Sequence, residues 1–313
     1  MRARTWLLLF IGCIAIGTGL AVILNVSLDI YGLYRNPLGR KLPVYGDSRV
    51  AKYLLSRRYV PANFNTVLIG SSMSANWEMT AVPRLRIYNA SLNGANVVEE
   101  KAIVDQALAN SGIAVALLIV HPYLTRSHDF ETVQLEPSLW WSSLGSDNLL
   151  TAYKDMLRDR LGRPEQSIDA AGAERFFKFP ARLNPTMQHL MRPGSSFDVD
   201  PVALTAYRGL VKELRAHGIQ IVFVIPPIAE RLLQSKAEAF LQYDAEMTAD
   251  RLPGEVVIDF TSPEFAAFRR NEANFSDGIH LYAKAAAEVV SQIGLRIGTA
   301  MAEGRLRLEA HSR

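Results

Sequence analysis

The sequence predicts a three-layer α/β/α sandwich around a mostly parallel five-stranded sheet, preceded by one N-terminal transmembrane helix. Two observations predict the sandwich: short unbroken runs of Val, Ile and Leu, which suit parallel strands covered on both faces, and longer amphipathic stretches between them. Strands that alternate with helices imply right-handed crossovers and helices on both sides of the sheet. A third observation, an uncharged apolar run near the N-terminus, predicts the membrane helix.

The apolar run extends from Trp6 to Val26 and contains no charged residue. About 20 apolar residues are enough to cross a bilayer as a helix. A cleavable signal peptide is the alternative, but its apolar region is usually shorter and ends in a small-x-small site, which is absent after this run. We therefore expect residues 1–26 to form a retained anchor. Cys13 lies inside the run and is the single cysteine, which excludes an intramolecular disulfide and a thiolate metal cluster.

Basic residues flank the run on both sides, and they bear on its orientation. Arg2 and Arg4 precede it closely, while Arg35, Arg40 and Lys41 follow within the window counted by the positive-inside rule. The charges nearest the helix favour a cytoplasmic N-terminus. The rest of the chain would then lie outside the cytoplasm.

A Pro- and Gly-punctuated connector without sustained periodicity covers residues 27–48, as is typical of a tether or a wrapping arm. The α/β domain is expected over residues 49–302. Its strand candidates are Thr66–Gly70, Leu85–Asn89, Ile113–His121, Ile219–Pro226 and Glu255–Phe260. Its helix candidates are Gly94–Asn110, Pro201–His217, Ala229–Arg251 and Tyr282–Ala302.

Residues 125–200 interrupt this alternation. They are rich in Trp, Arg, Pro and Gly and lack a strong strand, which predicts a partly helical insertion over one edge of the sheet. Residues 303–313 form a basic tail. The net charge of +3 is small for 313 residues and gives no reason to expect a nucleic-acid partner. No His/Asp/Glu cluster has metal-ligand spacing and no phosphate-binding or dinucleotide motif is present, so we expect neither a metal nor a cofactor.

A serine-rich turn directly follows the first strand candidate, in the order Gly70-Ser71-Ser72-Met73-Ser74. Ligands of open parallel sheets bind beyond the carboxyl ends of the strands. A serine on a strand-to-helix turn projects its hydroxyl there, and the N-terminus of the following helix offers free N–H groups that can stabilise an oxyanion. The alternative is that these serines only cap the helix.

Two further segments fall at strand ends. In Ser276–His280 the carboxylate of Asp277 can reach the imidazole of His280 and fix its tautomer, as a general base requires; an ordinary Asp-Gly turn is the alternative. In Asn89–Asn96 the backbone at Gly94 can approach a ligand closely and present its N–H. The alternative there is a plain glycine-containing loop before a helix.

The strand-end GxS turn, the NASxxG loop and the late DxxH, in this order, together resemble the SGNH (GDSL-type) hydrolase superfamily. The resemblance extends roughly from Asn65 to the last helix. It implies that Ser72 is the nucleophile and that Asp277 and His280 complete a catalytic triad. It also implies that the backbone N–H groups of Ser72 and Gly94 hold the oxyanion.

The sequence departs from the family pattern at two places. Ser71 stands where the family has the Asp of GDS, and the asparagine usual after the third strand is replaced by the sequence His121-Pro122-Tyr123. Losing one oxyanion donor can cost about a hundredfold in rate. We therefore expect another group to complete the hole, and the candidates are Tyr123, Asn93 and Asn96.

The variant first motif resembles that of divergent, membrane-anchored SGNH-like proteins of bacterial envelope polysaccharide systems, including alginate O-acetylation and teichoic acid D-alanylation. This implies a single-pass protein of the bacterial inner membrane with its catalytic domain in the periplasm. The expected activity is that of a serine esterase or O-acyltransferase acting on acyl groups, acetyl foremost, of a cell-envelope polysaccharide or exopolysaccharide. A membrane-bound acyltransferase is an expected partner.

Two other functions stay open at this stage. A non-catalytic SGNH-like subunit could bind polysaccharide or scaffold an acylation system, and the missing asparagine supports it. A lipid-directed esterase or thioesterase is compatible with the anchor. The sequence does not distinguish hydrolysis from acyl transfer, because both pass through the same acyl-enzyme.

Overall fold

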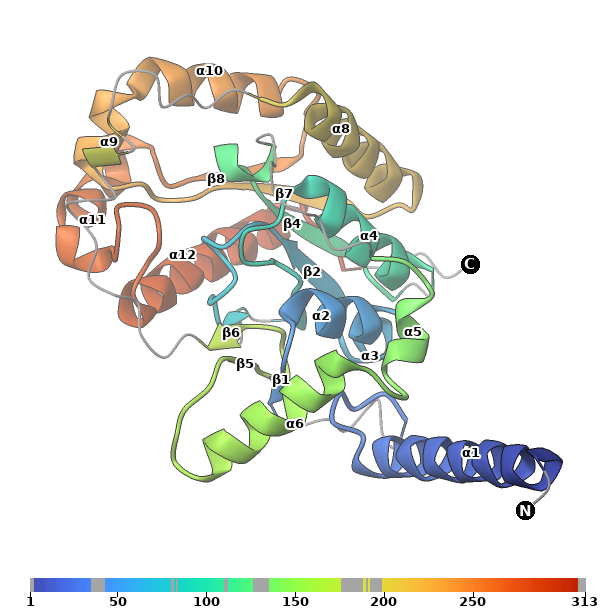
Figure 1. Cartoon of the computed structure of the whole chain (residues 1–313). Helices are drawn as coiled ribbons and strands as arrows, with labels where there is room; N and C mark the ends of the chain where they lie inside the picture. The colour runs from blue at the N-terminus through green and yellow to red at the C-terminus, as the bar shows by residue number, and fades with distance from the viewer. Residues whose placement is uncertain are drawn as a thin grey trace.

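The computed structural model describes residues 3–34, 43–79, 82, 84–109, 112–125, 135–175, 188–189, 191 and 199–308. Its main sheet has five strands, all paired in parallel, in the order β3-β2-β4-β7-β8 (Figure 1). The strands are β2 (Thr66–Ile69), β3 (Ile87–Asn89), β4 (Val115–Ile119), β7 (Gln220–Ile225) and β8 (Val256–Asp259). Each lies within a predicted strand, and the predicted fold class is confirmed.

Helices cover both faces of this sheet (Figure 1). One face is covered by α2 (Ser48–Ser56), α3 (Tyr59–Asn63), α4 (Val97–Leu108) and α8 (Pro201–Ala216), and the other by α9 (Glu230–Ser235) and α12 (Ala283–Ala302). Successive side chains of a strand point to opposite faces, so Val67 and Ile69 join one apolar core and Leu68 joins the other. Burial on both faces explains the unbroken apolar runs.

The helix predicted over Ala229–Arg251 is in fact two helices, α9 and α10 (Ala237–Met247), which meet at Lys236. Leu232 of α9 packs in the core on one side of the sheet, whereas Tyr243 of α10 packs in the core on the other side. Phe240 of α10 joins the same core as Leu232, so α10 contacts both cores. The short helix α11 (Ala266–Arg270) follows β8 and packs against α9.

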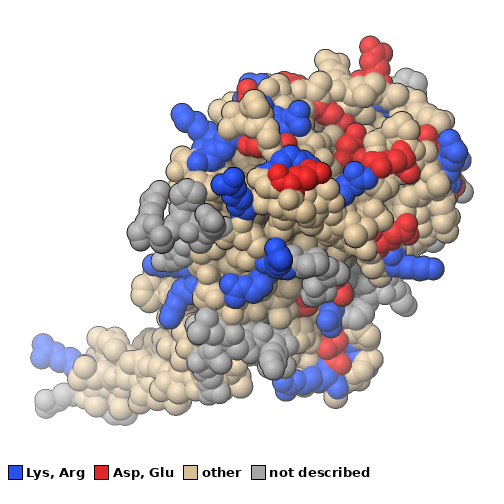
Figure 2. Space-filling model, turned by 180° about the vertical axis from the view of Figure 1, so that it is seen from behind, with Lys and Arg blue, Asp and Glu red and all other residues tan. Residues whose placement is uncertain are grey.

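The apolar helix α1 (Ala3–Leu28) contains 26 residues and has no buried residue. At 1.5 Å per residue it is about 39 Å long, which is enough to cross the ~30 Å hydrocarbon core of a bilayer. Figure 2 shows it as an uncharged projection with a basic side chain only near its tip, and Arg4 is its only charged residue. Its flanking residues Arg2, Arg35, Arg40 and Lys41 lie outside the described part of the chain.

The C-terminal end of α1 is hydrogen-bonded to the region predicted as an insertion. The Asn25 amide donates to the Leu144 carbonyl at 2.6 Å, and the Tyr153 hydroxyl donates to Asn25 Oδ1 at 2.8 Å. The described part of this region contains α5 (Leu139–Ser142) and α6 (Asp147–Arg160). These contacts fix the apolar helix to the folded domain.

A second, three-stranded antiparallel sheet was not predicted. It pairs β1 (Val44–Tyr45) with β5 (Ser167–Ile168), and β5 with β6 (Glu174–Arg175). Strands of two residues are too short to show a period, which is why the sequence pattern missed them. The predicted connector therefore contains a strand paired with the insertion.

The turn between β5 and β6 packs directly against β3. The Asn89 N–H donates to the Ala171 carbonyl at 2.7 Å. Gly172 has a φ of +89°, and a Cβ there would lie 2.3 Å from the Asn89 carbonyl oxygen, so only glycine fits. The insertion thus reaches the carboxyl end of the sheet.

The predicted basic tail is ordered over the part that the structure describes. Leu306 is buried in the core beneath α12, and the Arg307 N–H donates to Gln220 Oε1 at 2.9 Å. Residues 309–313 lie outside the described residues. On the face seen in Figure 2, basic and acidic side chains are interspersed among the described residues.

Candidate active site

The serine-rich turn follows β2 at the carboxyl end of the sheet. A Cβ at Gly70 would lie 2.5 Å from Ser74 Oγ and 2.9 Å from the Ile119 side chain, so glycine is needed for the turn to pack against β4. Ser72 is 8% exposed, which leaves its hydroxyl at the surface of the core. The predicted helix after Ser72 is wrong: residues 72–76 form consecutive turns, in which the Ser74 N–H donates to the Ser71 carbonyl at 3.1 Å.

The second turn, Ser276–His280, precedes α12. Gly278 has a φ of +96°, a conformation that favours glycine, and the Ser276 N–H donates to the His280 carbonyl at 2.8 Å. Phe275 and Ile279 are buried and anchor the turn. The sequence therefore fixes both the turn and the direction of its polar side chains.

These two turns meet, and three side chains form a continuous hydrogen-bonded chain. His280 Nε2 lies 2.8 Å from Ser72 Oγ, and His280 Nδ1 lies 2.7 Å from Asp277 Oδ2. With the imidazole proton on Nδ1, that group donates to the carboxylate and Nε2 accepts from the serine hydroxyl. This is the geometry that activates a serine nucleophile.

The second oxygen of the Asp277 carboxylate is also fixed. Asp277 Oδ1 accepts the backbone N–H of His280 at 2.9 Å and that of Ile279 at 3.2 Å. Burial by itself would raise the pKa of Asp277, but the hydrogen bonds and charge of His280 and the two N–H groups outweigh it and lower that pKa below its usual value. The carboxylate is thereby kept ionised to orient the imidazole.

Comparisons with known proteins give only distant similarity. No known protein family and no curated protein matches the sequence. A proposed platelet activating factor from Streptococcus pneumonia matches with a TM-score of 0.42 and 12% identity, over 82% of this chain and 91% of that one. A GDSL-like lipase from Bacteroides thetaiotaomicron VPI-5482 matches with a TM-score of 0.38 and 11% identity, over 78% of this chain and 91% of that one. A proposed acylhydrolase from Bacteroides fragilis NCTC 9343 matches with a TM-score of 0.35 and 11% identity, over 77% of this chain and 87% of that one.

TM-scores below 0.5 do not establish kinship, so the chemistry of the site must be inferred from its own geometry. The structure brings Ser72, Asp277 and His280 together. The oxyanion candidates lie on the neighbouring loop and at the end of β4.

The loop after β3, residues 90–96, lies beside the serine turn. The Leu92 N–H donates to the Gly70 carbonyl at 3.1 Å, and the Ser74 and Ser91 hydroxyls are 2.8 Å apart. Gly94 has a φ of +72°. Within the described residues, the N–H groups of Ser72 and Gly94 have no protein acceptor, so both are available to an oxyanion.

Asn89 ties the serine turn to this loop. Its buried amide nitrogen donates to the carbonyls of Ser74 at 2.7 Å and Trp77 at 3.0 Å, while its side-chain oxygen accepts the Ser91 N–H at 3.0 Å. One side chain thus sets the spacing of the two segments.

The three candidates for a further oxyanion donor, Tyr123, Asn93 and Asn96, each make a hydrogen bond within the protein. The backbone N–H of Tyr123 donates to His121 Nδ1 at 3.2 Å, and the Tyr243 hydroxyl donates to the His121 carbonyl at 2.8 Å, so His121 has a structural role at the end of β4. The side-chain oxygen of Asn96 caps α4 by accepting the Val98 N–H at 2.9 Å. The carbonyl of Asn93 accepts from Arg49 at 2.8 Å.

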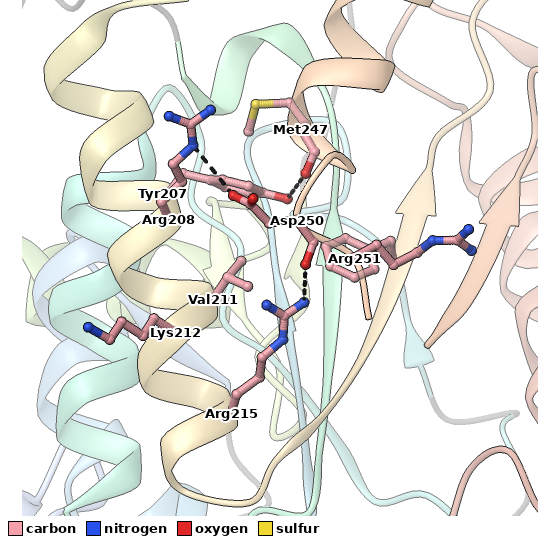
Figure 3. Close-up of a pocket in the computed structure, with 9 residues that line it drawn as sticks. Tyr207, Arg208, Val211, Lys212, Arg215, Met247, Asp250 and Arg251 are labelled. Carbon is pink, nitrogen blue, oxygen red and sulfur yellow. Dashed lines mark hydrogen bonds and ion pairs between the residues drawn. The ribbon is translucent and has the colours of Figure 1, made fainter. Parts of the chain in front are cut away.

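A separate cavity of about 410 Å³ lies between α8 and the end of α10 (Figure 3). It is lined by basic side chains that include Arg208 and Arg215, but both are paired: Arg208 with the Asp250 carboxylate at 3.6 Å, and Arg215 with Glu255 at 2.7 Å. None of the triad residues lines it. In the described part of the chain no group of three or more His, Cys, Asp and Glu could hold a metal ion.

The sequence pattern missed two residues near the site, Lys52 and Glu100, which are completely buried under the loop after β3. Lys52 occurs in the otherwise apolar stretch VAKYLL, where a charge on the buried face of a helix is unusual. That position was the one available signal. Glu100 gave none, since acidic residues are common in the first turn of a helix.

Proposed function

We propose that the chain is a serine esterase or O-acyltransferase of the SGNH type, acting on acyl groups of a carbohydrate. The observation that carries this proposal is the hydrogen-bonded chain from Ser72 through His280 to Asp277. Such a chain at the carboxyl end of a parallel sheet, next to backbone N–H groups that have no acceptor among the described residues, has the parts that acyl transfer needs.

In the first half-reaction, Ser72 Oγ attacks the ester carbonyl while His280 Nε2 takes the hydroxyl proton. Asp277 stabilises the imidazolium through Nδ1. The N–H groups of Ser72 and Gly94 hold the oxyanion of the tetrahedral intermediate. His280 then gives its proton to the leaving alcohol oxygen, which leaves an acyl-serine.

In the second half-reaction, a hydroxyl compound attacks the acyl-serine. His280 takes its proton and returns it to Ser72 Oγ as the acyl group leaves. Water as the attacking group gives hydrolysis, and a sugar hydroxyl gives acyl transfer. The same residues therefore serve both outcomes.

Two parts of the proposal rest on α1 and on the variant first motif, Gly70-Ser71-Ser72. They are the extracytoplasmic carbohydrate substrate and the acetyl group. The apolar helix would hold the domain at the periplasmic face of the inner membrane, where envelope polysaccharides and a membrane-bound acyltransferase partner are within reach. A membrane-bound acyl donor would suit transfer in that setting.

Turnover of p-nitrophenyl acetate by the purified protein tests the proposal. Ser72→Ala should lower kcat by about 10³-fold or more, since the nucleophile is lost. Ser71→Ala is the matched control, because it removes a neighbouring buried hydroxyl that has no hydrogen-bond partner among the described residues. A Ser72→Ala protein with full esterase activity would refute the assignment, and an inactive wild-type protein that binds polysaccharide would favour a non-catalytic subunit.

A further inference from the structure

The three residues before Gly94 are each held by an ionisable side chain from outside the loop. The contacts are Lys52 Nζ to the Ser91 carbonyl, the Leu92 N–H to Glu100 Oε1 at 2.9 Å, and Arg49 Nη2 to the Asn93 carbonyl at 2.8 Å. Lys52 and Arg49 come from α2, and Glu100 comes from α4.

Two of these side chains are ionisable groups without solvent contact. Lys52 and Glu100 are both 0% exposed. Lys52 is also paired with Glu174 of β6, whose carboxylate lies 3.4 Å away and accepts from Gln166 at 3.1 Å. Burial lowers the pKa of Lys52 and raises the pKa of Glu100 well above its usual value. Burying such groups costs free energy, and an apolar core of similar volume would often be as stable.

We propose that Lys52 and Glu100 are positioning residues, which fix the loop that carries the Gly94 N–H, and that Glu174 holds Lys52 in place. The inference rests on the proposed function, because it assigns these residues to the oxyanion hole of that reaction. It also gives the predicted insertion a role, since that region supplies β6.

The geometry explains why such a device would help catalysis. An oxyanion donor is effective when it is held in place before charge develops, so that no reorganisation is needed in the transition state. The Leu92 N–H is shared between Glu100 and the Gly70 carbonyl, which is 3.1 Å away. Glu100 therefore holds the same N–H group that links the loop to the serine turn.

Two substitutions at one position separate positioning from a general role in stability. Glu100→Gln keeps an oxygen that accepts the Leu92 N–H, whereas Glu100→Leu has a similar volume and no acceptor. We expect Glu100→Leu to lower kcat for p-nitrophenyl acetate by about tenfold to a hundredfold with KM within about twofold, because small misplacements cost rates of this order. Glu100→Gln should keep kcat within about threefold of wild type, since the acceptor is preserved.

Tyr207→Phe is the matched control. It removes one buried hydrogen bond between α8 and α10, from the Tyr207 hydroxyl to the Met247 carbonyl at 3.0 Å, and neither residue belongs to the loop (Figure 3). Its kcat should equal that of wild type. If Glu100→Leu does not fold, the double variant Lys52→Met/Glu174→Gln removes the buried ion pair as a unit, and the same fall in kcat is expected.

Hydrogen–deuterium exchange of the amides of residues 91–94 gives a readout that does not depend on turnover. Glu100→Leu or the double variant should speed exchange there, while Tyr207→Phe and Glu100→Gln should not. Unchanged exchange and kcat in Glu100→Leu and in the double variant would overturn the inference, and so would equal losses in Glu100→Gln and Glu100→Leu. If the wild-type protein shows no Ser72-dependent turnover, the proposed function fails. The role of Lys52 and Glu100 in catalysis then fails as well, even where hydrogen–deuterium exchange confirms that they hold the loop.

Discussion

The imidazole of His280 lies 2.8 Å from the hydroxyl of Ser72, although 208 positions separate the two residues in the chain. Contacts outside the triad hold their turns together. The Asn76 amide donates to the Leu281 carbonyl at 3.2 Å, and the Ala229 N–H donates to the Gly278 carbonyl at 2.8 Å. The alignment of serine and histidine is therefore set by the packing of both turns at the end of the sheet.

Replacing Asp277 with Asn should lower kcat by on the order of a thousandfold, with little change in KM. The amide can donate to His280 Nδ1 and so favour the wrong tautomer, and it removes the charge that stabilises the imidazolium. Steady-state kinetics on p-nitrophenyl acetate measure this. A loss of less than about threefold would mean that Asp277 is only a turn residue.

The acid stability of the same variant follows from the direction of the pKa shift. The pKa of Asp277 is depressed in the folded state, so its contribution to stability is present above its unfolded value of about 3.9 and is lost as pH falls through the folded value. Asp277→Asn lacks this contribution. Its unfolding free energy should therefore fall less than that of wild type between pH 5 and pH 2, as urea titrations can show; parallel curves would contradict the assignment.

Gly94→Ala should reduce both stability and activity. The left-handed backbone at φ +72° costs a residue with a Cβ about 1 kcal/mol, and relief of that strain would turn the N–H away from the oxyanion. Gly304→Ala is a matched control, with the same φ of +72° and open space around the added Cβ. Both variants should lose similar stability in urea, but only Gly94→Ala should lose kcat. Equal kcat in the two variants would remove Gly94 from the oxyanion hole.

Glu100→Gln should become more stable relative to wild type as pH rises. Burial raises the pKa of Glu100, so above the unfolded value of about 4.3 the folded protein holds a proton that the unfolded chain has released, and wild-type stability falls with rising pH. Glutamine does not titrate and escapes this loss. Urea unfolding at pH 4 and pH 7 tests the sign, and a relative stability that is independent of pH would contradict it.

The apolar helix α1 should stay on the mature protein as an anchor. We expect the full chain, expressed in a bacterium, to remain in the membrane fraction after an alkaline carbonate wash. Intact-mass measurement should find the N-terminal residues present. A shorter, soluble product lacking α1 would show that the segment is a cleaved signal peptide.

The fold was predictable where burial on both faces leaves a long apolar pattern. All five strands of the main sheet follow from such runs, and Asp200 and Pro201 mark the start of α8 as a helix cap and first residue. The break at Lys236 and the two-residue strands β1, β5 and β6 were not predictable. They depend on which side of the sheet a segment packs and on pairing between distant segments.

The hydrogen-bonded arrangement of Ser72, Asp277 and His280 was predictable because these residues lie in two short motifs. Ser72 follows a strand, and Asp277 and His280 share one turn. The support beneath the loop was not predictable, because Lys52, Glu100 and Glu174 meet only through the fold. No local pattern relates a lysine in a helix to a glutamate more than a hundred residues later in a two-residue strand.

Labelling with a fluorophosphonate probe, followed by peptide mass mapping, tests the central claim most directly, since the probe reacts only with an activated serine. The wild-type protein should carry one adduct, on Ser72, and His280→Ala should lose the labelling although the hydroxyl is still present. An unlabelled wild-type protein, or an adduct that persists in Ser72→Ala, would contradict the account.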